Sequence, residues 1–433
     1  MAGRRERGSG GSRDRLAEMV ELLQSYRGWT QKEVADALGR NVHAVVPESG
    51  NPKLDLVEKL SSVLDWPIEM IAADLREAGR DAEREAAAIS SDLDSSASDP
   101  STIVDEVWRL VDGECWEAVI ERTSPSRIDR LDREIRGRLL MYRQAALESN
   151  GQYLAAIEAC REGLDCVARG TETSYRLRGA LAYLLLVTDH PYDAEALAAS
   201  LVSELRDEPA ESPLRLHLGM SLLVRGLALR SQGALPGPRR LQLLNEARDS
   251  LNAASMMLTA LSENAGPPRV RSPGRTADVA AMEVSVLLGE MGAQEFVDSV
   301  VALLDDSPDV TTLDSIAAES LGWCCVFASR TIVAEPERID SPDRALAILT
   351  NKVDEIAERL GHWALRERLF TIEHLHRVQS LRDRGESPPW NLDDQDVRVL
   401  MGTMGRFPKF RRVGWRILRE VRRERREESE SRP

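Results

Sequence analysis

The sequence is poor in cysteine and aromatic residues, and these shortages exclude several classes of protein. Its five cysteines, Cys115, Cys160, Cys166, Cys324 and Cys325, form no CxxC pair, so their spacing predicts neither a metal site nor a disulfide framework. We expect buried free thiols in a reducing cytosol. Aromatic residues make up only 4% of the chain and charged residues 30%, while Leu, Ala, Arg and Glu dominate, a composition that favours helices.

Motifs for catalysis or cofactor binding are also missing. The chain has no G-x-S-x-G, P-loop or G-x-G-x-x-G motif. Among its six histidines only His374 and His376 are close neighbours, and on a helix these two side chains point about 200° apart. Glu358 and His362 have ligand spacing but lack a third ligand nearby. We therefore expect no enzyme activity, no cofactor and no metal site.

The chain lacks long apolar runs. We find no 18-residue apolar stretch and no apolar segment behind the N-terminal arginines, so the sequence predicts neither a membrane span nor a signal peptide. We therefore expect a cytoplasmic location. The net charge of −15 argues against a generic nucleic-acid binder. Basic residues instead concentrate at the ends: residues 406–426 carry ten Arg or Lys against Glu420 and Glu424.

A small helical module is predicted at residues 14–75. Residues 14–26 form an amphipathic first helix with Leu16, Met19, Val20 and Leu23 on one face. Thr30 with Glu33 forms a capping box that starts a second helix. Gly39 can take the left-handed conformation that ends this second helix. Asn41 can cap a short third helix over residues 42–46, which Pro47 must end. Two more helices complete a five-helix plan: an amphipathic one over residues 54–64, whose apolar residues include Leu54, Leu56 and Leu60, and one from Trp66 onward.

Three stretches of this module resemble the Cro/repressor-type (XRE) helix-turn-helix family. They are W-T-Q-K-E-V-A-D-A-L-G at 29–39, N-P-x-L at 51–54 and L-x-x-V-L-D-W-P-I-E-M-I at 60–71. The resemblance implies that the second helix abuts the DNA backbone and the third enters the major groove of double-stranded DNA. The implied DNA-binding residues are Gln31, Lys32, Arg40, Asn41, His43 and Ala44. The chain departs from the family in the segment 39–51, which is about three residues short.

The charge of the module leaves two functions open. Residues 14–75 hold six Lys or Arg against eleven Asp or Glu, so the module alone should bind DNA weakly. We expect a transcriptional regulator that binds two half-sites as a homodimer. The alternative is a protein-interaction scaffold whose degenerate helix-turn-helix no longer binds DNA.

The rest of the chain is predicted as a helical array. Residues 1–13 read as a disordered basic arm and residues 76–101 as a Ser/Asp-rich linker. Across residues 102–396, helix pairs recur without a strict period. One pair, read through Gly151, Tyr153, Ala156 and Cys160, resembles a tetratricopeptide (TPR) repeat, although Gln144 replaces the usual small residue. The resemblance implies an α-solenoid of helix hairpins with a groove for a peptide or protein ligand.

Further pairs are expected in the array. They are 214–232 with 241–261, 279–304 with 313–332, and 345–360 with 363–381. Residues 397–433 form a basic C-terminal helix and tail, in which the helix can bury Trp415, Leu418 and Val421 and expose a guanidinium stripe. Three roles for that stripe stay open: a solvated cap, a phosphate-contacting surface, or a contact for an anionic partner or membrane.

Overall fold

The computed structural model confirms the all-α class. Every regular element among the described residues is a helix. The described residues are 16–17, 19–20, 23, 29–41, 45–47, 53–64, 66, 68, 71–72, 100–264, 271–305, 309–385, 388–390 and 392–431. Contacts divide the chain into two compact units. We call Asp99–Gln379 the repeat unit, and we call Met1–Ser98 together with Ser380–Pro433 the terminal unit.

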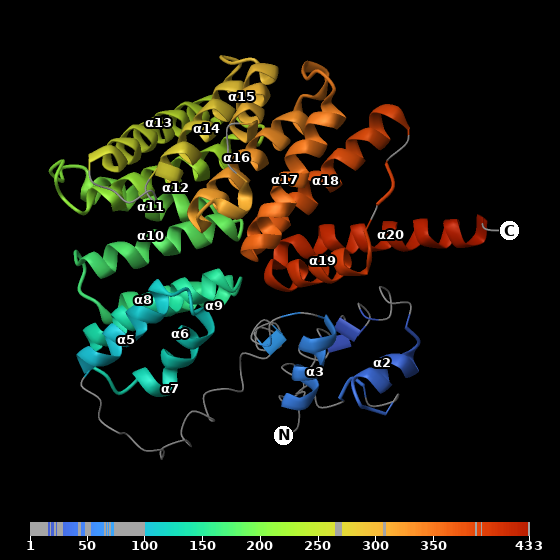
Figure 1. The fold of residues 1–433 in the computed structure, drawn as a ribbon, viewed down its shortest axis with the longest axis horizontal. Helices are drawn as coiled ribbons and strands as arrows, with labels where there is room; N and C mark the ends of the chain where they lie inside the picture. The colour runs from blue at the N-terminus through green and yellow to red at the C-terminus, as the bar shows by residue number, and fades with distance from the viewer. Residues whose placement is uncertain are drawn as a thin grey trace, which may run out of the picture. The chain divides into compact units, whose positions relative to one another are not determined.

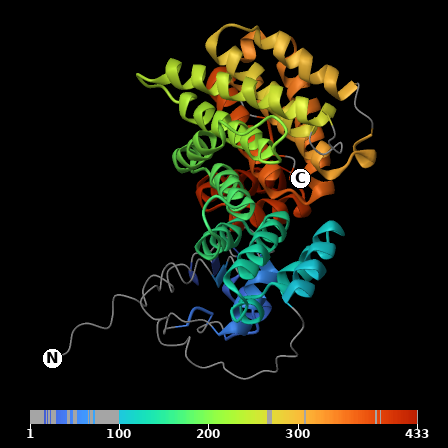
Figure 2. The ribbon, with the colours of Figure 1, turned by 90° about the vertical axis from the view of Figure 1, so that its left-hand side faces the viewer.

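The repeat unit is an array of helices, most of which pack on a neighbour in the sequence (Figures 1 and 2). Its helices are α5 Pro100–Asp112, α6 Trp116–Arg122, α7 Pro125–Ile128, α8 Arg133–Ser149, α9 Tyr153–Cys166, α10 Glu172–Val187, α11 Pro191–Leu205, α12 Arg215–Gly233, α13 Arg240–Asn264, α14 Arg271–Leu288, α15 Ala293–Asp305, η4 Val310–Thr312, α16 Ser315–Ala334, η5 Pro336–Arg338, α17 Pro342–Leu360 and α18 Trp363–Arg384.

The hairpin of α8 and α9 has the features that the TPR resemblance implied. Gly151 takes a positive φ of 71° at the turn, and Tyr153, Ala156 and Cys160 are buried. Small residues allow similarly close packing of α12 on α13, where a Cβ on Gly226 would lie 2.5 Å from the Leu251 side chain. Antiparallel helices can therefore pack backbone against side chain, which is the basis of a stacked hairpin array.

Two parts of the array differ from the sequence expectation. Residues 279–304 were expected as one member of a pair, but α14 ends at Leu288 and Gly289, with a φ of 76°, turns the chain into α15. The break was not predicted because both helices have a buried apolar face, so the apolar pattern continues across it. The hairpin of α10 and α11 was not predicted, although it supplies part of the cavity described below.

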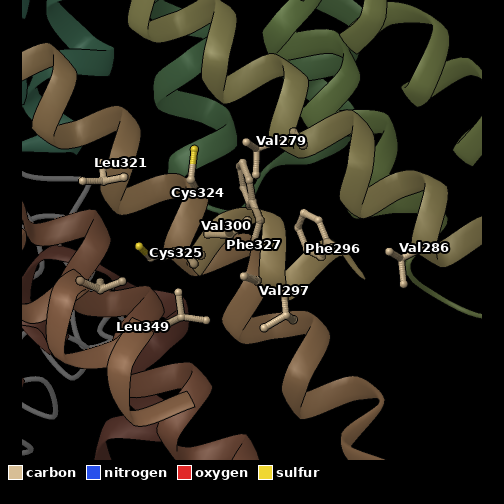
Figure 3. Close-up of a cluster of buried hydrophobic side chains, with 14 of the residues drawn as sticks. Val279, Val286, Phe296, Val297, Val300, Leu321, Cys324, Cys325, Phe327 and Leu349 are labelled. Carbon is tan, nitrogen blue, oxygen red and sulfur yellow. The ribbon is translucent and has the colours of Figure 1, made fainter. Parts of the chain in front are cut away.

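The main hydrophobic core of the repeat unit lies among its later helices. Figure 3 shows Phe296, Val297 and Val300 of α15 beside Phe327 of α16, and all four are buried. Cys324 and Cys325 are buried in the same cluster, where burial raises the pKa of both thiols, that of Cys324 to about 12. All five cysteines are free, but Cys115 is exposed, so the expectation of buried thiols fails there.

The terminal unit is built from both ends of the chain. Its helices are α2 Gln31–Ala37, α3 Leu54–Leu64, α19 Asp394–Arg406, η6 Pro408–Phe410 and α20 Arg411–Ser431. Helical residues before α2 bury the predicted face, Leu16, Met19, Val20 and Leu23. Leu56, Leu60 and Leu64 are buried on α3, whereas Leu54, expected to face inward, is 67% exposed.

Candidate DNA-binding module and ligand groove

Helix α2 begins and ends as the sequence predicts. The Thr30 hydroxyl accepts the backbone N–H of Glu33 at 3.3 Å, and the Glu33 carboxylate accepts the backbone N–H of Thr30 at 2.7 Å. The backbone and side-chain hydrogen bonds from Thr30 hold the pKa of Glu33 below its usual range. Val34, Ala35 and Leu38 are buried, and Gly39 turns the chain with a φ of 60°. Gln31 and Lys32 are exposed on the first turn, as a DNA-contacting position requires.

Arg40 is held by an ion pair that the sequence did not predict. Its Nη2 lies 2.9 Å from Oδ1 and 3.0 Å from Oδ2 of Asp55, on the first turn of α3. The Arg40 side chain is 21% exposed and that of Asp55 is 54% exposed. Arg40 would have to leave or share this carboxylate to read a base. Asn41 is exposed, and the two other expected base-reading residues, His43 and Ala44, lie outside the described residues.

The short third helix is not formed as expected. Val45 and Val46 lie in a bend instead of a helix, and Val45 is only 4% exposed. Pro47 accounts for this, because it cannot donate a helical hydrogen bond and it restricts the residue before it to extended conformations. Residues 42–44, the rest of that helix, lie outside the described residues. Any helix that could contact the bases is therefore shorter than the sequence predicted.

The C-terminal helices pack on the N-terminal module within the terminal unit. Helix α19 contacts α3. A Cβ on Gly405 would lie 2.7 Å from the Trp66 ring, so only glycine allows this approach. The Arg411 guanidinium lies 5.5 Å from the centroid of the Trp66 ring, a cation–π distance. The sequence had placed residues 397–433 in a segment of their own, and no local signal reveals their contact with Trp66.

The repeat unit contains a cavity of about 730 Å³. Its lining comes from α5, α8, α10, α12, α14 and α16, with Pro191 of α11 and Arg368 of α18. Most of the lining is apolar, including Met220, Leu227, Trp323 and Phe327. A mostly apolar cavity of this size with a few converging polar groups is typical of a ligand site.

One end of the cavity is acidic. The Tyr183 hydroxyl donates to Glu319 Oε1 at 3.0 Å, and the Trp323 indole N–H donates to the same atom at 3.2 Å. His362 Nε2 lies 3.1 Å from Glu319 Oε1. Burial raises the pKa of Glu319, but His362, Trp323 and Tyr183 lower it by more. The Glu319 carboxylate on α16 is thus bound by Tyr183 on α10, a helix that is distant in the chain.

Glu148 lies next to this cluster with the opposite shift. Burial, and then the charge of Glu319, raises the pKa of Glu148 to about 7. Gln144, the residue that departs from the TPR pattern, donates its amide N–H to Glu148 Oε2. Gln144, which departs from the repeat pattern in the sequence, therefore hydrogen-bonds to the buried carboxyl group of Glu148 in the structure.

The other end of the cavity is basic. Glu283 is buried on α14 and binds two guanidinium groups: Arg230 through Nε at 3.0 Å and Arg330 through Nη2 at 3.0 Å. One carboxylate thus faces two cations. Burial, and then the charge of Arg230, lowers the pKa of Arg330 to about 9. Glu319 and Arg330 are 11 residues apart on the same face of α16, so the two ends are separated by about 16 Å.

Two further features of the described residues bear on function. No group of three or more His, Cys, Asp or Glu side chains among them could hold a metal ion. One described helix, α16, is long and apolar enough to cross a membrane by length and composition, although 67% of that window is buried inside the protein. Its apolar composition is explained by its place in the core of the repeat unit.

No protein-family model matches the sequence. No curated protein matches it significantly. The crystal structure of Bacillus thuringiensis PlcR in complex with the peptide PapR7 and DNA aligns with 82% of this chain and 98% of that chain, at 13% identity and a TM-score of 0.30. At this score the similarity does not establish a shared fold, so the function proposed below rests on the residues described above.

Proposed function

We propose that this chain is a DNA-binding transcriptional regulator of the cytoplasm, whose repeat unit binds a peptide or protein segment. The DNA-binding part of this proposal rests on the structure of helix α2. Its capping box, its buried Val34 and Ala35, and the left-handed Gly39 are the features expected of the first half of a helix-turn-helix. Gln31 and Lys32 are then presented to a DNA backbone, and Arg40, Asn41, His43 and Ala44 would follow toward the bases.

The DNA-binding proposal is tested by selecting binding sites for the full-length protein from a library of random duplexes. Binding to a recovered site is then compared with that of a Gln31→Ala, Lys32→Ala double variant by fluorescence anisotropy. We expect a loss of roughly tenfold or more, from two contacts worth on the order of 1 kcal/mol each. Lys352→Ala, on the repeat unit, is the control and should bind as wild type. Unchanged binding by the double variant would remove α2 from the interface.

A second function, a protein-interaction scaffold without DNA binding, is favoured by two observations. Arg40 is engaged by Asp55, and the module carries more acidic than basic residues. Recovery of no enriched sequence from the duplex library would favour this scaffold. We also infer a homodimer that binds two half-sites, because one such module offers few phosphate contacts. Sedimentation equilibrium of the full-length protein with and without a recovered duplex tests the dimer.

The ligand half of the proposal rests on the cavity of the repeat unit. Gly179 lines this cavity, and a Cβ added there would meet no atom within 4 Å. Gly179→Phe should therefore place a bulky ring in the cavity from a position where a side chain can start without a clash. We expect the variant to lose binding to peptides selected by wild-type protein from a displayed random library. Gly237→Phe, also in open space but outside the cavity lining, should keep it. Equal binding by both variants would place the ligand elsewhere.

A further inference from the structure

Helix α20 carries a row of exposed arginines. Its members are Arg412, Arg416, Arg419 and Arg423, which we call the α20 arginine stripe. Their spacing of four, three and four residues places all four on one face of the helix. At 1.5 Å per residue the stripe spans about 16 Å along the helix axis.

The two described acidic residues of α20 are only partly exposed, and both are hydrogen-bonded to Trp390. Glu420 accepts the indole N–H of Trp390 at 3.0 Å, and Glu424 accepts the Trp390 backbone N–H at 2.8 Å. The opposite side of the helix buries Ile417, Leu418 and Val421. Among its described side chains, α20 therefore has exposed guanidinium groups and no fully exposed carboxylate.

The stripe is fixed to the module that we propose binds DNA. Trp66 follows α3 and packs on Gly405 and Arg411, so α19, α20 and the N-terminal module belong to one compact unit. The two segments complement each other in charge. Residues 14–75 hold six basic and eleven acidic residues, whereas residues 406–426 hold ten basic and two acidic ones. Phosphates are thus drawn more strongly to α20 than to the rest of the unit.

A lipid surface fits this helix poorly. An interfacial membrane helix presents a broad apolar face to the acyl chains while its basic face meets the headgroups. In α20 that apolar face is already buried in the protein, and none of the large apolar side chains that are exposed in the described residues lies on α19 or α20. A regular row of guanidinium groups without exposed apolar neighbours instead suits the phosphates of a nucleic-acid backbone.

We propose that the α20 arginine stripe binds the phosphate backbone of the DNA duplex that α2 contacts, so that the DNA-binding surface is made by both ends of the chain. The inference rests on the proposed DNA-binding function. Each strand presents a phosphate about every 3.4 Å of helix axis, so a 16 Å row can meet several of them. The stripe carries no sequence information; it supplies the affinity that the acidic module lacks.

The test changes all four arginines of the stripe to glutamine in the full-length protein. Binding to a selected duplex and to an unrelated duplex is measured by fluorescence anisotropy across a range of KCl concentrations. We expect affinity for both duplexes to fall. The slope of log K against log salt should become flatter by about 0.9 for each phosphate that the variant no longer neutralises, in total about 2 to 4. A variant with lysine in place of the same four arginines should keep most of the slope of log K against log salt.

The matched control removes the same charge from the repeat unit, at the exposed residues Arg130, Arg138, Arg161 and Arg206. Thermal melts of all variants check that they fold. A stripe variant with the slope and affinity of this control would overturn the inference while leaving DNA binding by α2 intact. Absence of DNA binding by the wild-type chain would overturn both. Loss of binding to anionic vesicles with an unchanged DNA slope would assign the stripe to a membrane instead.

Discussion

The two units of this protein are assembled in different ways. In the repeat unit most helices pack on a neighbour in the sequence, whereas the terminal unit joins segments that are more than 300 residues apart. The repeat unit has a large apolar core, in which the buried carboxylate of Glu283 binds two arginines. In the terminal unit the net charge differs between its two segments, with an acidic excess on the N-terminal module and a basic excess over residues 406–426. The proposed DNA surface therefore depends on a contact between the two ends of the chain.

The largest effect is expected from Trp66→Ala, which breaks that long-range contact. Trp66 is 5% exposed and packs on Gly405 and Arg411. Truncating a buried aromatic side chain costs about 3–5 kcal/mol, a large part of the stability of a small unit. Hydrogen exchange should show weaker protection in α3 and α19, with protection in α12 and α13 unchanged.

The control for this change is Trp108→Ala in the repeat unit. Trp108 is 48% exposed, so its removal should cost far less. An equal fall in protection in both units would mean that they unfold together, and the contrast between them would not hold.

A slightly smaller effect is expected from Glu283→Gln in the repeat unit. Glu283 is 1% exposed and neutralises Arg230 and Arg330, of which Arg330 keeps 25% of its side chain exposed. Removing the carboxylate of such a pair costs about 3 kcal/mol, because Arg230, which is largely buried, and the buried part of Arg330 lose their counterion. The measurement is urea unfolding of the full-length protein.

Glu290→Gln is the matched control, since its partner Arg248 forms a surface pair with it. It should cost less than about 1 kcal/mol. A Glu283→Gln variant no less stable than Glu290→Gln would show that the two arginines need no buried counterion.

The smallest effect concerns pH and Glu148. Burial and the neighbouring Glu319 raise the pKa of Glu148 from 4.5 to about 7. Between these values the folded protein keeps the proton while the unfolded chain has released it, so this residue makes the protein less stable as the pH rises through that window. The total change is about 3 kcal/mol at most.

Glu148→Gln should remove this dependence. The difference in unfolding free energy between variant and wild type is expected to grow from pH 5 to pH 7.5 in favour of the variant. A difference that stays constant across that range would show that Glu148 titrates normally. Subtracting the two proteins cancels the contribution of the histidines, which are the same in both.

The sequence predicted the elements well where the signal is local. The capping box of Thr30 and Glu33, the left-handed Gly39 and the buried face of Leu16, Met19, Val20 and Leu23 follow from periodicity and turn chemistry. Most of the expected helix pairs of the array also correspond to observed helices. The predicted domain ranges and DNA-contacting residues stay predictions.

What the sequence missed depends on partners distant in the chain. Nothing near Arg40 indicates that Asp55 binds it, and nothing near Trp66 points to Gly405. The buried cluster of Tyr183, Glu319 and His362 draws on separate parts of the chain, each of which looks like an ordinary amphipathic helix by itself.

The sequence by itself determined that this protein is helical, where most of its helices begin and end, and which faces they bury, because these properties arise from interactions within a few residues. Only the tertiary structure decided which charged side chains are brought together and which lie at the surface. In the repeat unit Glu283 binds Arg230 and Arg330, and Glu319 binds His362. On the described part of α20, Glu420 and Glu424 are partly buried beside Trp390, while four arginines are exposed. Charge pairing acts between side chains that folding alone brings together, and composition cannot reveal it.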